Sequence, residues 1–235
     1  MYKYLLTISS FFIFFSNSSV FAQRWGVAAF TGLANYQGDL VEQTLAVNET
    51  HGAAGANATW RYNEHWAVRG NFHITRLSGN DQNSVLLAHR GFQFSTPIRL
   101  FSGDLMYYFT RYAPRFDNQR NFVADGIAPY IFLGLGRTFM RPQIQGLPAT
   151  SPDWSARVSI YQATGKAGVG MAWHKTPRFT VNLESTICVP NTDYLDRVSL
   201  SGKPGNRDWY LFLGLNLQYW VDPIEKLKAP KHLFD

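Results

Sequence analysis

The chain has 235 residues, of which 46% are hydrophobic, 16% aromatic and only 16% charged, and its formal net charge is +6. After the first residues no apolar run approaches the ~20 residues of a membrane-spanning helix, which argues against a helical membrane protein. The positive charge is spread along the chain without a basic helix or a nucleic-acid motif, so we expect no nucleic-acid partner.

The amino terminus predicts export. Lys3 precedes an apolar run at residues 5–15, and small and polar residues follow it up to Ala22. This is the order of a secretory signal peptide, and the run is about half as long as a spanning helix. We therefore expect residues 1–22 to be cleaved off. The only cysteine, Cys188, lies far from that junction, so neither a lipid anchor there nor an internal disulfide is expected.

Eight segments of the remaining chain alternate with a period of two residues, as strands do. They are residues 25–34, 52–62, 66–76, 98–109, 127–139, 162–174, 179–189 and 209–220. The last is the clearest: its odd-numbered residues are apolar from Trp209 to Tyr219, whereas Gly214, Asn216 and Gln218 share the other face. Aromatic residues at both ends of an apolar face are typical of a strand that crosses a bilayer.

Segment 127–139 alternates less regularly. Ile131, Leu133 and Leu135 share an apolar face, and Arg137 falls on the same face. That arginine needs either a place at the rim of the membrane or a β-bulge that shifts the phase.

The polar faces of these segments carry opposite charges: Arg69, Asp104, Lys166 and Glu184. The alternatives are a secreted sandwich and a lipocalin-like barrel. A lipocalin keeps apolar side chains inside, whereas a membrane barrel turns them outward and encloses the polar ones. We therefore predict an all-β protein, an eight-stranded antiparallel transmembrane β-barrel of the outer membrane, of the small OmpA or OmpX type, over residues 23–220. Eight strands enclose a lumen that side chains fill, so the four charges are expected to form an internal ion-pair network; the alternative places them at the rims, in water.

An even number of strands returns both termini to the periplasmic side. Tight turns at residues 63–65 and 175–177 are expected there, and the longer connections 36–51, 77–96, 142–161 and 190–208 are expected outside. One periplasmic connection, residues 111–126, is long, and a tail at 221–235 follows the last strand. The basic residues in these two regions predict a periplasmic protein contact, with a merely solvated rim as the alternative; they are Arg111, Arg115, Arg120, Lys226 and Lys228.

No motif in the chain predicts catalysis. None of the six histidines has metal-ligand spacing with another histidine or with Cys188, and the glycine-bearing stretches GLGRTF and GVGMAW lie in strands with no helix behind them to hold a phosphate. We expect a noncatalytic protein with no metal, no cofactor and no small-molecule substrate.

Four stretches carry a family resemblance: NYQGDL from Asn35, APYIFLGLG from Ala128, TDYLDRVS from Thr192 and GNRDWYLFLGLNLQY from Gly205. Together they resemble the PorG-type outer-membrane β-barrel proteins of Bacteroidetes. The residues that match the recognisable motifs are Asn35, Tyr36, Gly38, Asp39, Thr192, Asp193, Tyr194, Leu195 and Asp196. Their expected role is structural, because carboxylates near strand ends can accept hydrogen bonds from loop amides.

The resemblance implies a noncatalytic component of the type IX secretion and gliding machinery. In that role the barrel lies among outer-membrane lipids and anchors a periplasmic ring made of a lipoprotein and its partner. The alternative is a freestanding outer-membrane integrity or adhesion barrel that acts through its extracellular loops.

Overall fold

The computed structural model describes residues 24–37, 49–80, 93–110, 115–116, 122–123, 126–146, 160–176, 178–192, 195 and 208–221. The expected signal peptide and the tail beyond Val221 lie outside these residues. Within them, no helix is both long enough and apolar enough to cross a membrane.

The described residues contain eight long strands and three short ones. The long strands are β1 (Arg24–Gln37), β2 (Thr50–Arg61), β3 (Trp66–Asn80), β4 (Gln93–Tyr108), β7 (Ala128–Met140), β9 (Tyr161–His174), β10 (Phe179–Pro190) and β11 (Trp209–Trp220). The short ones are β5 (Arg115–Phe116), β6 (Phe122–Val123) and β8 (Gln143–Gln145).

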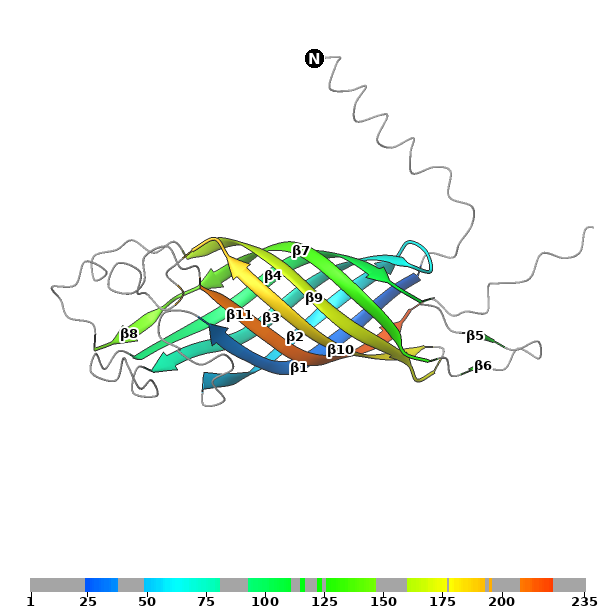
Figure 1. Cartoon of the computed structure of the whole chain (residues 1–235), viewed down its shortest axis with the longest axis horizontal. Helices are drawn as coiled ribbons and strands as arrows, with labels where there is room; N and C mark the ends of the chain where they lie inside the picture. Colours follow the sequence, from blue (N-terminus) through cyan, green and yellow to red (C-terminus); the bar gives the residue numbers. More distant parts are fainter. Residues whose placement is uncertain are drawn as a thin grey trace, which may run out of the picture.

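The long strands form a closed barrel (Figure 1). Each pairs antiparallel with its neighbour in the chain, and β1 pairs with β11 from Gly26 opposite Trp220 to Gln37 opposite Trp209. Closure matters in a bilayer, because lipid offers no hydrogen-bond partner to the free edge of a sheet.

Side chains alternate between the two sides of the barrel wall. On β11, Leu213, Leu215 and Leu217 are 48%, 46% and 55% exposed, whereas Asn216 and Gln218 are 1% and 3% exposed. The other long strands repeat the pattern, so large apolar side chains cover the exterior and polar ones are enclosed. This is the arrangement of a barrel in lipid, and the predicted eight-stranded antiparallel transmembrane β-barrel of the outer-membrane type, with a filled lumen, is confirmed.

The strand boundaries at one end were predicted too short. β3 continues to Asn80 and β4 starts at Gln93, so residues 77–80 and 93–96 pair instead of forming a loop. Two of their inward side chains are large and apolar, Leu77 and Phe94, which are 0% and 1% exposed, and this weakens the contrast between faces that was used to find the strands. Pro97 lies where pairing of β4 with β7 has ended and pairing with β8 has not begun, a gap that tolerates a missing N–H.

Two connections contain strands that were not predicted. β8 lies in the expected outer loop 142–161 and pairs with β4 at residues 93–95. β5 and β6 lie in the connection 111–126 and pair with each other, beyond the end of the barrel at which β1 begins (Figure 1).

The register through β7 is continuous. Arg137 lies opposite Phe101 of β4 and opposite Ala163 of β9, and its side chain is exposed on the outer surface. A bulge is therefore excluded, and the arginine stays on the apolar face near the end of its strand.

Candidate functional site

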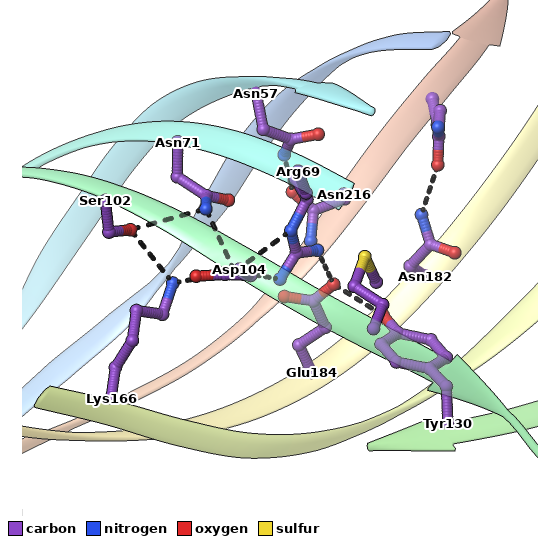
Figure 2. Close-up of polar contacts among 12 residues, drawn as sticks. Asn57, Arg69, Asn71, Ser102, Asp104, Tyr130, Lys166, Asn182, Glu184 and Asn216 are labelled. Carbon is purple, nitrogen blue, oxygen red and sulfur yellow. Dashed lines mark hydrogen bonds and ion pairs between the residues drawn. The ribbon is translucent and has the colours of Figure 1, made fainter. Parts of the chain in front are cut away.

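The middle of the lumen holds four charged side chains in contact. Arg69 lies directly opposite Asp104, Asp104 opposite Gly134, and Gly134 opposite Lys166, so one row crosses β3, β4, β7 and β9. Glu184 comes from β10 and reaches the same cluster (Figure 2).

Asp104 is the centre of this cluster. Its Oδ2 lies 3.0 Å from Arg69 Nη2 and 3.1 Å from Lys166 Nζ, and it accepts a further hydrogen bond of 2.9 Å from Asn71 Nδ2. Arg69 Nη1 donates to Glu184, which also accepts the hydroxyl of Tyr130. Two positive and two negative groups thus balance, as charges must when they are withdrawn from water.

Gly134 makes the cluster possible. A Cβ at this position would collide with Asp104 Oδ1 and Lys166 Cγ. Without a side chain on β7, Lys166 can extend across the gap in the row and reach Asp104 on the strand beyond.

The end of the lumen with the short turns is closed by aromatic rings. Trp220, Tyr108 and Tyr130 are 2%, 1% and 1% exposed, and they belong to one buried cluster. Tyr108 and Tyr130 pack with ring centroids 4.8 Å apart. Trp220 Nε1 donates to Thr180 Oγ1 at 3.0 Å, and Arg61 covers the indole ring at 5.2 Å.

The opposite end is closed by residues from four segments that are separated in the sequence. Asp208 accepts the Tyr36 hydroxyl at 2.7 Å and the Leu195 amide at 2.9 Å. Leu195 is 0% exposed, and its carbonyl accepts a 2.6 Å hydrogen bond from Thr96 Oγ1. Leu195, which belongs to the 190–208 connection, is therefore fixed at the mouth of the lumen. It belongs to one buried cluster with Tyr36 and Phe94, whose ring centroids lie 4.8 Å apart.

This mouth brings three of the family-like stretches together: Tyr36 belongs to NYQGDL, Leu195 to TDYLDRVS and Asp208 to GNRDWY. Asn35 lies beside them and donates to Thr50 at 2.9 Å. Thr192 is half-buried after β10. The other candidate residues of these motifs lie outside the described residues: Gly38, Asp39, Asp193, Tyr194 and Asp196.

The candidate periplasmic contact residues are described only in part. Arg115 lies in β5. Arg111, Arg120, Lys226 and Lys228 lie outside the described residues.

For several residues of these clusters the sequence indicated the face but not the partner. Tyr130 and Gly134 were expected on the inward face of their strand, and their contacts with Glu184, Asp104 and Lys166 were not predicted. Asp208 belongs to the GNRDWY stretch, but its partners Tyr36 and Leu195 are 172 and 13 residues away. The residues next to Asp208 in the sequence carry no signal for these contacts.

The side chains of His73 and Cys188 are buried in the lumen. The His73 ring lies 4.7 Å from that of Phe30 and 5.3 Å from that of Phe212. Cys188 is buried and free. Over the described ranges, no three His, Cys, Asp or Glu side chains gather in a way that could hold a metal ion.

Known solved structures of small outer-membrane barrels are similar to this chain. Neisserial surface protein A is 12% identical, with a TM-score of 0.48, and the match covers 83% of this chain and 96% of that one. A major outer membrane protein of Thermus thermophilus is 11% identical, with a TM-score of 0.44 and coverages of 85% and 99%. Ail of Yersinia pestis is 12% identical, with a TM-score of 0.41 and coverages of 83% and 98%.

No curated protein matches the sequence. Neither the similar structures nor the matching family description names a PorG-type protein or a secretion system, so that resemblance is carried forward only as a proposal. The match to a family model extends over residues 5–223, and its description is a domain of unknown function. The chain therefore belongs to the DUF6089 family.

Proposed function

We propose that this protein is a sealed, noncatalytic barrel of the outer membrane that serves as an anchor rather than as a conduit. The observation that carries the proposal is the filled lumen. An aromatic cluster, an ion-pair network and a capped mouth follow one another along the barrel, so the described side chains close the lumen at three successive levels. An anchor acts through what projects from its ends.

The inner end offers a projection suited to that role. The connection 111–126 joins β4 to β7 there, contains the β5–β6 pair and carries arginines at 111, 115 and 120. In barrels of this kind the inner connections are usually short turns, and a long one is a place for contact. Together with the resemblance to PorG-type proteins, this supports the specific role of anchoring the periplasmic lipoprotein ring of a type IX secretion system.

Affinity purification from outer membranes tests the anchor. The tagged full chain is compared with a variant that lacks residues 222–235 and has a shortened 111–126 connection. A matched control shortens the outer connection 81–92 instead. The anchor predicts that a periplasmic lipoprotein co-purifies with the full chain and with the control, and is lost from the inner variant.

The folding of each variant is checked by the electrophoretic mobility of its unheated sample. Recovery of a lone barrel from the unaltered chain, with protein secretion intact after deletion of the gene, would sink the anchor proposal.

The outer mouth favours a second candidate. Hydrogen bonds of Asp208 and Thr96 fix Leu195 at the mouth, which holds part of an outer connection in place. A freestanding integrity or adhesion barrel would use such a rim to present its loops. That candidate predicts that loss of the 81–92 connection, and not of the inner one, impairs cell adhesion or envelope integrity.

A further inference from the structure

The outward face of the barrel carries little charge. Among the eight long strands, as far as their side chains are described, the charged residues on that face are Arg76, Arg99 and Arg137, and none of them is acidic. All three are exposed. Charge on a lipid-facing surface is unfavourable at the centre of the bilayer and much less so at its interface.

The three arginines form a belt on consecutive strands, β3, β4 and β7. Arg99 lies opposite Ile74, two residues below Arg76, and Arg137 lies opposite Phe101, two residues below Arg99. Because barrel strands tilt by roughly 35–45°, rows of paired residues climb toward the outer mouth from β3 to β7. From Arg76 to Arg99 and from Arg99 to Arg137 the position shifts two residues along the strand away from the mouth, which offsets the rise of the rows. The three arginines therefore lie at similar depth near the mouth.

Aromatic rings accompany the arginine belt (Arg76, Arg99 and Arg137). Phe72 and Phe101 have ring centroids 4.5 Å apart, and Phe139 and Tyr161 are 4.7 Å apart. Such rings mark the level of the lipid headgroups. The belt therefore lies where phosphate groups of the outer leaflet lie, which gives its positive charge a complement.

A groove leads from the belt along the apolar surface. It is lined by Arg137 and Phe139 at one end and by Leu217 and Tyr219 at the other. Its floor includes Gly70 and Gly103, above which the surface is open. A free phosphate ion would use only the belt, whereas a phosphorylated lipid would use the belt for its headgroup and the groove for an acyl chain.

We propose that the arginine belt binds the phosphate of an outer-leaflet lipid, with an acyl chain in the adjoining groove. The site lies on one side of the barrel only: at the same level, β1, β2, β10 and β11 present uncharged residues such as Leu33, Ala54, Val189 and Leu211. Lipid binding of this kind is independent of any periplasmic partner and goes beyond the anchor role.

The test compares two double variants in phosphatidylcholine nanodiscs doped with lipid A that carries two phosphates or none. Arg99→Gln with Arg137→Gln removes most of the belt. Lys175→Gln with Arg178→Gln removes two exposed charges at the opposite end and is the matched control. Native mass spectrometry counts the lipid molecules that each full chain retains.

We expect the unaltered chain and the control to retain the phosphorylated lipid in preference to the unphosphorylated one. The belt variant should lose roughly tenfold or more of that preference, since each basic residue near a charged lipid surface contributes about one kcal/mol. Arg99→Lys with Arg137→Lys keeps the charge, and it should keep most of the preference while guarding against a folding defect in the first variant. Equal retention of both lipids by the unaltered chain, or an undiminished preference in a folded belt variant, would overturn the proposal.

Discussion

Asp104 shows how much one buried side chain holds together. One of its carboxylate oxygens contacts Arg69, Lys166 and Asn71, and the residue is only 2% exposed. Arg69 in turn spans the lumen to Glu184 on the opposite wall. Removal of one partner leaves the others charged and out of water, which is costlier than removal of the whole pair.

Replacement of Glu184 by Gln is therefore expected to destabilise the barrel by about 3 kcal/mol, because Arg69 loses its second carboxylate. Urea unfolding in lipid vesicles, followed by tryptophan fluorescence, measures this. The double variant Arg69→Met with Glu184→Met should lose less stability than the sum of the losses in Arg69→Met alone and in Glu184→Met alone. Additive losses would show that the two groups do not interact in the membrane.

Gly134 gives a second prediction at this scale. Gly134→Ala places a methyl group against Asp104 and Lys166, so the lysine must retract from the carboxylate. We expect a loss of about 1–3 kcal/mol, the usual range for overpacking. Gly70→Ala on the outward face, where nothing lies within 4 Å of the added Cβ, is the matched control. The same unfolding assay should separate them, and equal stability of the two variants would contradict the role given to Gly134.

At the scale of single elements, the mouth of the barrel was hardest to predict from the sequence. Alternation located the central part of every long strand, because there the polar and apolar faces differ. Near the mouth the inward side chains of β3 and β4 include large apolar ones, such as Leu77 and Phe94, so the contrast between faces is weaker. The charged cluster was predictable as a set of inward residues, but its pairing depends on the register between strands.

The cap formed by Leu195 leads to a prediction for this element. Asp208→Ala removes the acceptor of both the Tyr36 hydroxyl and the Leu195 amide, and each lost hydrogen bond at a buried site costs about 1–3 kcal/mol. The amide of Leu195 should then exchange with deuterium at least roughly tenfold faster, while amides in the middle of β10 stay protected. Tyr36→Phe removes only one of the two bonds and should give a smaller effect. Unchanged exchange at Leu195 in Asp208→Ala would show that the cap is held by other contacts.

The whole molecule has three successive seals, and they come from different residues. The four charged residues belong to neither the aromatic cluster at the inner end nor the capped mouth, although Tyr130 of the aromatic cluster donates its hydroxyl to Glu184 of the network. An eight-stranded barrel has little room inside, so each layer can close the lumen without help from the others.

Planar-bilayer recordings test this independence. The unaltered barrel should show no stepwise ion conductance, and neither should Asp208→Ala, because the network and the aromatic cluster still fill the lumen when the cap loosens. Replacement of the four charged network residues by serine should also leave it closed, since Trp220 and Tyr108 block the inner end. Conductance is expected only when all three layers are removed together, that is, when Asp208→Ala is combined with replacement of the network residues, Trp220 and Tyr108 by small residues. Steady conductance through the unaltered barrel would make it a conduit and would remove the basis for assigning its function to the segments at its ends.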